Sequence, residues 1–531
     1  MEQAQSSSLP ETKASFSAKL AMGGLALVLF LVSLNQTIVG TAMPRIIAEL
    51  NGFELYAWVT TAYLLFETAV IPIVGKLGDM YGRKWLTIIG VAIFLLTSAL
   101  CGASPNMIWL IVARGLQGIG GGMIFSTTFT LVADIYPDLK ERARNQGLLF
   151  SVFTLSSVIG PVLGGWITDA FGWRWLFYIN IPLGLATLFI LARVLPQNPR
   201  QENAKIDYWG SVTSAIGVIA LLLSVELLNF GFSWSSPIVV GGLVVAIIML
   251  SLFIWIETRV PDPIIPLRLF RDRTISATTA VMFLNGVAMF GVSLYAPLYA
   301  QGVLGVSPSV SGMLMIPMVI TMTVMGIVVG QLMAKFEMVK PFILIGLVIL
   351  TVAGFLLLTL STTSSPWLLA FFLFVVALGM GGIMPATTMA IQLSVDPREL
   401  GVATAATQYV RSIGATVATA LIGTVVTNSY LKALYNTVSS DVPSEAVELL
   451  HNPNALINAE ALTNLQKIVA TLPNGSQLLE TLLETTRISL TQAIHSGFWL
   501  MIISTIMAIG CALFIRNIRL TGMPMPGGPG H

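Results

Sequence analysis

Fourteen long apolar stretches constrain the fold of this sequence more than any other feature. Each has the roughly 20 residues that an α-helix needs to cross the hydrocarbon core of a bilayer. The whole chain is poor in charge, with 55% hydrophobic and only 10% charged residues, against about 25% charged in soluble proteins. The sequence therefore predicts an all-α integral membrane protein that crosses the bilayer many times. The stretches lie near residues 20–43, 56–77, 85–103, 107–132, 145–168, 175–195, 208–230, 236–256, 275–300, 309–334, 341–360, 366–392, 402–428 and 496–516.

The distribution of basic residues predicts the orientation of the chain in the membrane. Most of the 27 lysines and arginines fall in the N-terminal segment, in every second loop and in the C-terminal segment. Cytoplasmic loops of membrane proteins carry an excess of Lys and Arg. We therefore expect both termini in the cytoplasm and the protein in the cell (plasma) membrane.

An internal repeat groups twelve of the stretches into two sets of six. The segment GGGMIFSTTFTLVADIYPDLKERARNQG from Gly120 resembles GMGGIMPATTMAIQLSVDPRELGVATAATQ from Gly379, and a weaker match pairs the segments that begin at Gly75 and Gly330. Parallel repeats of a six-helix unit are a known transporter design, with the substrate site between the halves near the middle of the membrane. The seventh and eighth stretches are then an insertion between the two repeats.

These observations give the expected division of the chain. It consists of a cytoplasmic tail at 1–19, an N-terminal six-helix bundle at 20–200, two inserted linker helices at 201–274, a C-terminal six-helix bundle at 275–516 and a cytoplasmic tail at 517–531. One extracytoplasmic loop, 429–495, is far longer than usual connections. Its segments SEAVELL and GSQLLETLLETTRISLTQAI have the leucine spacing of amphipathic helices. The loop is either a packed cap or a surface that meets an amphiphilic substrate or a partner.

The loop after the second stretch, GKLGDMYGRK from Gly75, combines glycines, an acid and a basic pair. An acid at this place can bind a nearby arginine or the N-terminus of a neighbouring helix, and such a contact can form in one gated state and break in another. We expect conformational gating by Gly75, Asp79, Gly82, Arg83 and Lys84. The alternative is a basic turn without a switching role.

Several further motifs are separated along the chain. They are RGLQGIGGG from Arg114, GPVLGG from Gly160, WRW from Trp173, PIIPLRLF from Pro263 and PLYAQG from Pro297. With them the chain, from about Leu20 to Arg516, resembles the major facilitator superfamily and, within it, the fourteen-helix branch of drug:proton antiporters. The resemblance implies two six-helix bundles plus two inserted helices, an intramembrane arginine motif at Arg114 and an antiporter motif at Gly160, Pro161, Gly164 and Gly165.

The antiporter motif also has a physical interpretation. Its glycines let helices approach closely, while Pro161 removes a backbone donor and favours a bend. A bendable, tightly packed helix could seal leak paths through the protein. The alternative is a packing seam without a part in the mechanism.

The first stretch carries two adjacent amides, Asn35 and Gln36, at a depth where polar groups are rare. The branch that the chain resembles commonly has an aspartate in this helix, and this sequence departs from it with Asn35. An amide can hydrogen-bond to a substrate or to Arg114, but it cannot carry a proton at physiological pH. Arg114 itself lies deep enough to need a partner in the protein interior, unless it snorkels to the interface.

The departure at Asn35 moves the search for a proton carrier to other acids. Glu67 lies roughly 18 Å, and Arg114 roughly 10 Å, from the outer ends of their helices, a difference that arginine can nearly span. Burial disfavours an ionised carboxylate and a nearby arginine favours it, and this competition can place proton exchange near neutral pH. We expect proton coupling by Glu67 and Arg114, and the alternative for Glu67 is a hydrogen-bonded packing role.

The remaining expected cavity residues are polar or basic groups within the spans. The substrate cavity is expected to include Asn35, Gln36, Tyr63, Gln117 and Arg411. Arg411 could instead snorkel to lipid phosphates, and snorkelling is the expectation for Glu226.

The sequence also limits the kind of function. It has no phosphate-binding loop for ATP, no nucleophile elbow and no zinc signature. We therefore expect no enzyme activity, no catalytic residues, no cofactor and no metal site.

The expected function is proton-coupled export of hydrophobic or cationic drug-like compounds by alternating access. A dedicated lipid or metabolite exporter of the same fold and a non-transporting sensor are the alternatives. The expected partners are a small hydrophobic or amphiphilic substrate, protons and the lipid bilayer, with no nucleic acid, and the protein is expected to be a monomer.

Overall fold

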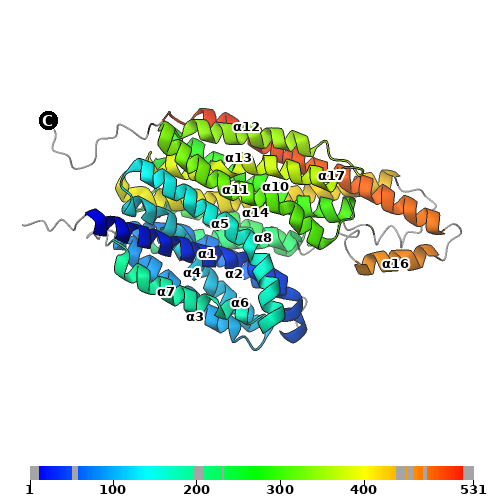
Figure 1. Cartoon of the computed structure of the whole chain (residues 1–531), viewed down its shortest axis with the longest axis horizontal. Coiled ribbons are helices and arrows are strands. Elements are labelled where there is room, and N and C mark those ends of the chain that lie inside the picture. Colours follow the sequence, from blue (N-terminus) through cyan, green and yellow to red (C-terminus); the bar gives the residue numbers. More distant parts are fainter. Residues whose placement is uncertain are drawn as a thin grey trace, which may run out of the picture.

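The computed structural model describes residues 11–50, 55, 58–196, 207–229, 232–437, 450, 459–470, 475–517 and 519, and its elements are almost entirely helical (Figure 1). Thirteen of the described helical stretches are long and apolar enough to cross a membrane. A fourteenth is the bent helix α5 (Leu139–Phe171), when its two arms are counted as one span. The expected multi-pass, all-α membrane protein is confirmed.

The first bundle contains α1 (Glu11–Leu50), α2 (Trp58–Tyr81), α3 (Arg83–Gly102), α4 (Met107–Ile135), α5, α6 (Trp175–Tyr178) and α7 (Asn180–Val194). The second contains α10 (Arg273–Leu298), α11 (Pro308–Phe336), α12 (Lys340–Leu357), α13 (Pro366–Gln392), α14 (Leu400–Thr437) and α17 (Gly475–Leu513). Hereafter these are the N-terminal and C-terminal bundles. The short helices α6 and α7 together form one span, Trp175–Val194.

The two bundles use the same helix pairings. In the N-terminal bundle α4 packs on α2 and α3, while α1 packs on α5 and α7. The equivalent pairs in the C-terminal bundle are α13 with α11 and α12, and α10 with α14 and α17. Close backbone crossings repeat as well: a Cβ on Gly120 would lie 2.9 Å from the carbonyl oxygen of Gly90, and one on Gly379 would lie 2.7 Å from that of Gly346. The repeat in the sequence is thus a repeat of the packing.

Polar caps fix where several helices begin. The side chain of Asn106 accepts from the backbone N–H of Trp109 at the start of α4, and Asp138 accepts from that of Glu141 at the start of α5. Asp272 caps α10 in the same way. Because these side chains satisfy backbone donors that have no partner inside the helix, they terminate the preceding loop and start the next span.

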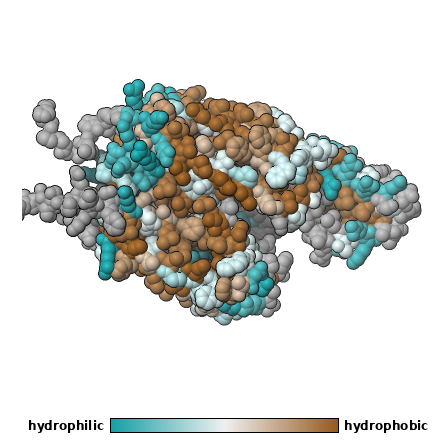
Figure 2. Space-filling view, viewed as in Figure 1, coloured by the Kyte–Doolittle hydropathy of each residue, from teal (hydrophilic) through white to brown (hydrophobic). Residues whose placement is uncertain are grey.

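Helix α1 begins and helix α17 ends at the same end of the molecule (Figure 1). We call this the basic end, because the basic loops of the sequence lie there, and the opposite end the α16 end after α16 (Ala459–Ala470). Figure 2 shows hydrophilic surface at the basic end and apolar surface along the middle of the molecule. The apolar middle is the surface expected to contact lipid.

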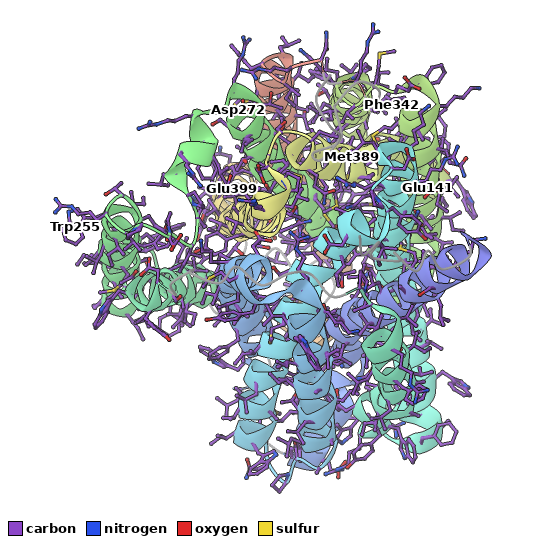
Figure 3. The ribbon with its side chains drawn as sticks, turned by 90° about the vertical axis from the view of Figure 1, so that its left-hand side faces the viewer. Glu141, Trp255, Asp272, Phe342, Met389 and Glu399 are labelled. Carbon is purple, nitrogen blue, oxygen red and sulfur yellow. The ribbon has the colours of Figure 1, made fainter. Side chains whose placement is uncertain are left out.

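The inserted helices α8 (Tyr208–Asn229) and α9 (Pro237–Glu257) form a hairpin at one side of the bundles. Viewed from the basic end, α9 with Trp255 stands at the outer edge (Figure 3). The inner helix α8 packs on both α2 and α14. Glu226 of α8 accepts a hydrogen bond from Thr61 of α2 at 3.1 Å, so it has a protein contact that the snorkelling expectation did not include.

Much of the long segment 429–495 is helical where it is described. Helix α14 continues to Thr437, and α17 begins at Gly475, twenty-one residues before the predicted start of the last span at residue 496. With 39 residues, α17 is roughly 58 Å long, about twice the thickness of a hydrocarbon core. It extends beyond the other helices toward α16 (Figure 1). Most of the SEAVELL segment lies outside the described residues.

Candidate functional site

Arg114, on α4, is fully buried and is held by neutral acceptors. Its Nε donates to the carbonyl oxygen of Val59 at 3.1 Å, and its Nη1 donates to Oε1 of Gln117 at 2.8 Å. Nη1 also donates to Oδ1 of Asn35 on α1. The guanidinium lies 4.3 Å from the ring centroid of Tyr63, a cation–π geometry. The arginine is therefore a fixed positive charge at the junction of α1, α2 and α4.

Glu67, on α2, is the acid of this region and is only 5% exposed. Nε2 of Gln36 donates to both of its carboxylate oxygens, at 2.9 Å and 2.8 Å. Within the described residues, Glu67 and Arg114 form no ion pair. The adjacent amides of α1 thus have different partners, because Asn35 binds the arginine and Gln36 binds the glutamate.

The C-terminal bundle contributes Arg411 of α14. Its Nε donates to Oε1 of Gln408 at 2.9 Å, and its guanidinium lies 5.9 Å from the ring centroid of Phe125 on α4. Both arginines lie near enough to Glu67 to interact with it electrostatically. The predicted cavity residues of the N-terminal bundle thus contact either Arg114 (Asn35, Tyr63 and Gln117) or Glu67 (Gln36), and Arg411 comes from the other bundle. Sequence reasoning missed Gln408, although it lies one helical turn before Arg411 in QYVR.

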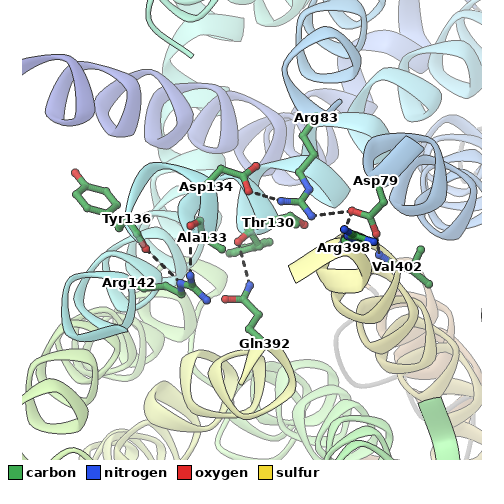
Figure 4. Close-up of polar contacts among 12 residues, drawn as sticks. Asp79, Arg83, Thr130, Ala133, Asp134, Tyr136, Arg142, Gln392, Arg398 and Val402 are labelled. Carbon is green, nitrogen blue, oxygen red and sulfur yellow. Dashed lines mark hydrogen bonds and ion pairs between the residues drawn. The ribbon is translucent and has the colours of Figure 1, made fainter. Parts of the chain in front are cut away.

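At the basic end, two of the predicted gating residues, Asp79 and Arg83, lie where the two bundles meet (Figure 4). Asp79 binds Nη2 of Arg83 at 2.7 Å and accepts from the backbone N–H groups of Gly401, at 3.0 Å, and Val402, at 2.8 Å. These N–H groups belong to the first turn of α14, so an acid of the N-terminal bundle caps a helix of the C-terminal bundle. Nη1 of Arg83 also binds Asp134 of α4 at 2.5 Å.

The other predicted gating residues support this connection. Gly82 separates α2 from α3 with a φ of 93°, a conformation that side chains rarely adopt. Lys84 donates to the carbonyl oxygen of Leu195 at 2.8 Å and ties α3 to the end of α7. A Cβ on Gly75 would strike the Cβ of Ala405 on α14. All five residues thus lie at or beside the basic-end junction of the bundles.

Further hydrogen bonds across the bundles were not anticipated from the sequence. Nε2 of Gln146 on α5 donates to Oε1 of Gln392 on α13 at 3.3 Å, and Nε2 of each glutamine also donates to the carbonyl oxygen of Phe129. Ser151 of α5 donates to the carbonyl oxygen of Thr323 on α11 at 2.6 Å. The signal that could have suggested Gln392 is a lone amide at the end of the otherwise apolar helix α13.

The antiporter motif lies where α5 bends and packs on α1. The arms Leu139–Ser157 and Val162–Phe171 meet at 48°, around the position of Pro161, which cannot donate a backbone hydrogen bond. A Cβ on Gly160 would strike Oγ1 of Thr37, and one on Gly164 would strike Oγ1 of Thr41. A Cβ on Gly165 would meet no atom within 4 Å. Two of the three glycines therefore permit the close α1–α5 crossing.

The arrangement can bind and exchange protons at one buried carboxyl group and can present positive charge to a ligand. Among the described residues, no group of three His, Cys, Asp or Glu side chains could hold a metal ion. Figure 1 shows the bundles joined toward the basic end and diverging toward α16. Chemically, the site offers proton exchange and polar binding.

Comparisons with known proteins agree with this architecture. Residues 25–419 match the family model described as the Major Facilitator Superfamily. The chain is 36% identical to the "Multidrug transporter protein MdtP" of Bacillus subtilis (strain 168), covering 94% of both chains. It is 30% identical to "Multidrug resistance protein 3" of the same organism, covering 95% of this chain and 96% of that one.

Two solved structures share the fold. The human organic anion transporter MFSD10 (TETRAN) superimposes with a TM-score of 0.57 at 13% identity, covering 91% of this chain and 99% of that one. The proton:xylose symporter XylE superimposes with a TM-score of 0.58 at 14% identity, covering 95% and 97%. At these identities the likeness concerns the fold alone. From the family match, the two Bacillus relatives and the paired bundles together, we conclude that the chain is a multi-pass membrane transporter, not an enzyme, and belongs to the major facilitator superfamily.

Proposed function

We propose that this transporter exports hydrophobic or cationic, drug-like amphiphiles in exchange for protons, by alternating access between the two bundles. The printed names of the two Bacillus relatives, a multidrug transporter and a multidrug resistance protein, support drug-like substrates. The basic end would face the cytoplasm, in keeping with the distribution of Lys and Arg. A proton moving through a potential of 100 mV supplies about 2.3 kcal/mol, enough for modest concentrative export.

Glu67 is the observation that carries the proton-coupling part of the proposal. It is a buried carboxylate between the bundles, and its described hydrogen bonds come from an uncharged amide, Gln36. Such a group can exist with or without a proton, since no arginine fixes it in the ionised form by direct contact. A cationic substrate and a proton would then compete for the same carboxylate, and this competition couples their movements.

The Asp79 contacts support the alternating-access part. They exist only while α14 begins next to the end of α2, so opening of the basic end must break them. The Asp79 carboxylate would then keep its contact with Arg83 and lose the two backbone donors of α14. The proposed cycle therefore includes this state, in which Asp79 joins the bundles at the basic end, and a second state in which these contacts are broken.

Reconstituted proteoliposomes test the proposal. With an imposed pH gradient, the wild-type protein should move a fluorescent cationic dye against its concentration gradient, and Glu67→Gln should abolish this movement. Glu226→Gln, the same change at another glutamate within a span, is the matched control and should retain dye movement. Gradient-driven movement that survives Glu67→Gln would overturn the Glu67 assignment. A protein that moves lipid and no dye would be the dedicated lipid exporter instead.

A further inference from the structure

The C-terminal bundle presents unpartnered hydrogen-bond donors next to the proposed proton site. Gln408 is 1% exposed, and its Oε1 accepts from Nε of Arg411, so its Nε2 points away from that contact. This buried Nε2 has no hydrogen-bond partner in the part of the chain that the structure describes. In the same part, Nε is the only side-chain nitrogen of Arg411 with a hydrogen bond, and its guanidinium has no carboxylate partner.

The free groups of this pair are all donors. The amide oxygen of Gln408, its only acceptor, is used by the arginine. Unpartnered buried donors are costly, and a planar guanidinium beside an amide N–H matches the two oxygens of a carboxylate. The side-chain groups of the Gln408–Arg411 pair that remain without a described partner thus match an anionic ligand in hydrogen-bonding character.

The surroundings of the pair indicate what else such a ligand would carry. Phe125, under the Arg411 guanidinium, packs edge-on against Phe129, with ring centroids 5.3 Å apart, and against Phe153, at 5.8 Å. These aromatic side chains belong to α4 and α5 of the N-terminal bundle. Glu67, on α2, belongs to the same bundle as the rings. It lies near enough to Arg411 for the two groups to interact electrostatically. A positive charge, aromatic rings and an acid thus lie near one another where the two bundles meet.

We propose that Arg411, positioned by Gln408, binds the carboxylate of zwitterionic aromatic amphiphiles, whose cationic group lies toward Glu67. This inference rests on the proposed export function and extends its substrate class, because it adds carboxylate-bearing aromatic compounds to simple lipophilic cations. A ligand of this kind contacts both bundles at once. It would satisfy the free donors of the C-terminal bundle and the carboxylate of the N-terminal bundle in a single pose.

A matched pair of dyes tests the proposal. A rhodamine ethyl ester is a cation, and its free acid has the same rings and cation with an added carboxylate. In proteoliposomes with a pH gradient, the wild type should export both dyes. Arg411→Gln should lower export of the free acid by about tenfold or more, the size of a lost charge-assisted hydrogen bond, and change export of the ester by less than about twofold. Arg411→Lys, which keeps the charge and loses the planar geometry, should fall between the two.

Binding measurements keep the result interpretable. The anisotropy of each dye with the purified full-length protein gives its affinity without any need for transport, and Arg45→Gln, at an exposed ion pair with Asp169, is the matched arginine control. If Arg411→Gln weakens binding of the free acid and leaves binding of the ester unchanged, carboxylate binding by Arg411 is supported. This holds even if transport of both dyes fails and the export function is wrong. Equal losses of affinity for both dyes would overturn carboxylate binding by Arg411, because Arg411 would then act on Glu67 or on the fold. Wild-type export or binding of the ester without the free acid would overturn it as well.

Discussion

At the basic end, α2 meets α14 in the same way as α11 meets α5. A Cβ on Gly75 would lie 3.0 Å from the carbonyl oxygen of Gly401, and one on Gly330 would lie 2.8 Å from that of Ala143. Gly75 and Gly330 begin the weaker of the two repeated segments, so they are equivalent positions of the two bundles. The two crossings therefore form a symmetric backbone seam.

The centres of the same helices differ. When GKLGD from Gly75 is laid on GQLMA from Gly330, the positions of Tyr63 and Glu67 correspond to Met318 and Met322, which are buried and apolar. Asp79 corresponds to Ala334. The comparison teaches that the seam is a property of both repeats, whereas the acids Glu67 and Asp79 of α2 have apolar counterparts on α11.

The largest effect is expected from removing the central charge of the N-terminal bundle. Arg114→Met would leave Asn35, Gln117 and the Val59 carbonyl without their donor, and each buried acceptor left unpaired costs about 1–3 kcal/mol. We expect no transport and a thermal midpoint several degrees lower. Arg45→Met, at the exposed pair with Asp169, should change neither quantity. Transport that survives Arg114→Met would show that transport does not depend on the positive charge at the centre of the N-terminal bundle.

The symmetry of the seam can be tested by equivalent glycines. Gly75→Ala and Gly330→Ala should each hinder closure of the basic end to a similar extent, since overpacking costs about 1–3 kcal/mol. Spin labels on Pro137 and Asp396, in a protein without Cys101 and Cys511, would report a longer distance across the basic end in both variants. Gly23→Ala is the matched control, because a Cβ there would meet no atom within 4 Å. A shift in one variant alone would contradict the symmetric seam.

A smaller shift is expected from giving the N-terminal bundle the residue of its counterpart. Asp79→Ala removes the cap of α14, and loss of a helix cap costs about 0.5–2 kcal/mol. The same spin labels should report a partial shift toward the open basic end. Asp138→Ala, which removes the cap of α5 and does not touch α14, should lower stability without that shift. An unchanged distance in Asp79→Ala would mean that the seam alone holds this state.

The sequence predicted the number of spans, the repeat and the basic-end motif because these depend on local patterns. Apolar length and the glycine at position 82 are read from neighbouring residues, whereas the cap at Asp138 was not predicted. It could not predict that Gln36 contacts Glu67 while Asn35 contacts Arg114, because adjacent residues of a helix point in different directions and the rotation of α1 is fixed by packing. Pairs such as Gln146 with Gln392 depend on how two bundles meet, and no local pattern contains that information.

The smallest effect is expected at the α16 end, where the bundles again use different chemistry. In the N-terminal bundle, Glu49 accepts hydrogen bonds from Arg174 and from Trp173, and these contacts hold its pKa below the usual 4.5. In the C-terminal bundle, Tyr299 donates to the carbonyl oxygen of Ser361 at 2.7 Å, a contact without charge.

Because the folded pKa of Glu49 is lowered, the stabilisation that its carboxylate contributes is present above pH 4.5 and is lost as the pH falls through the folded value. Glu49→Gln should therefore lower the thermal midpoint by only about 1 °C at pH 7, as befits an exposed pair, and the difference from wild type should vanish in acid. Tyr299→Phe should lower the midpoint equally at both pH values, and a pH-independent effect of Glu49→Gln would contradict this contrast.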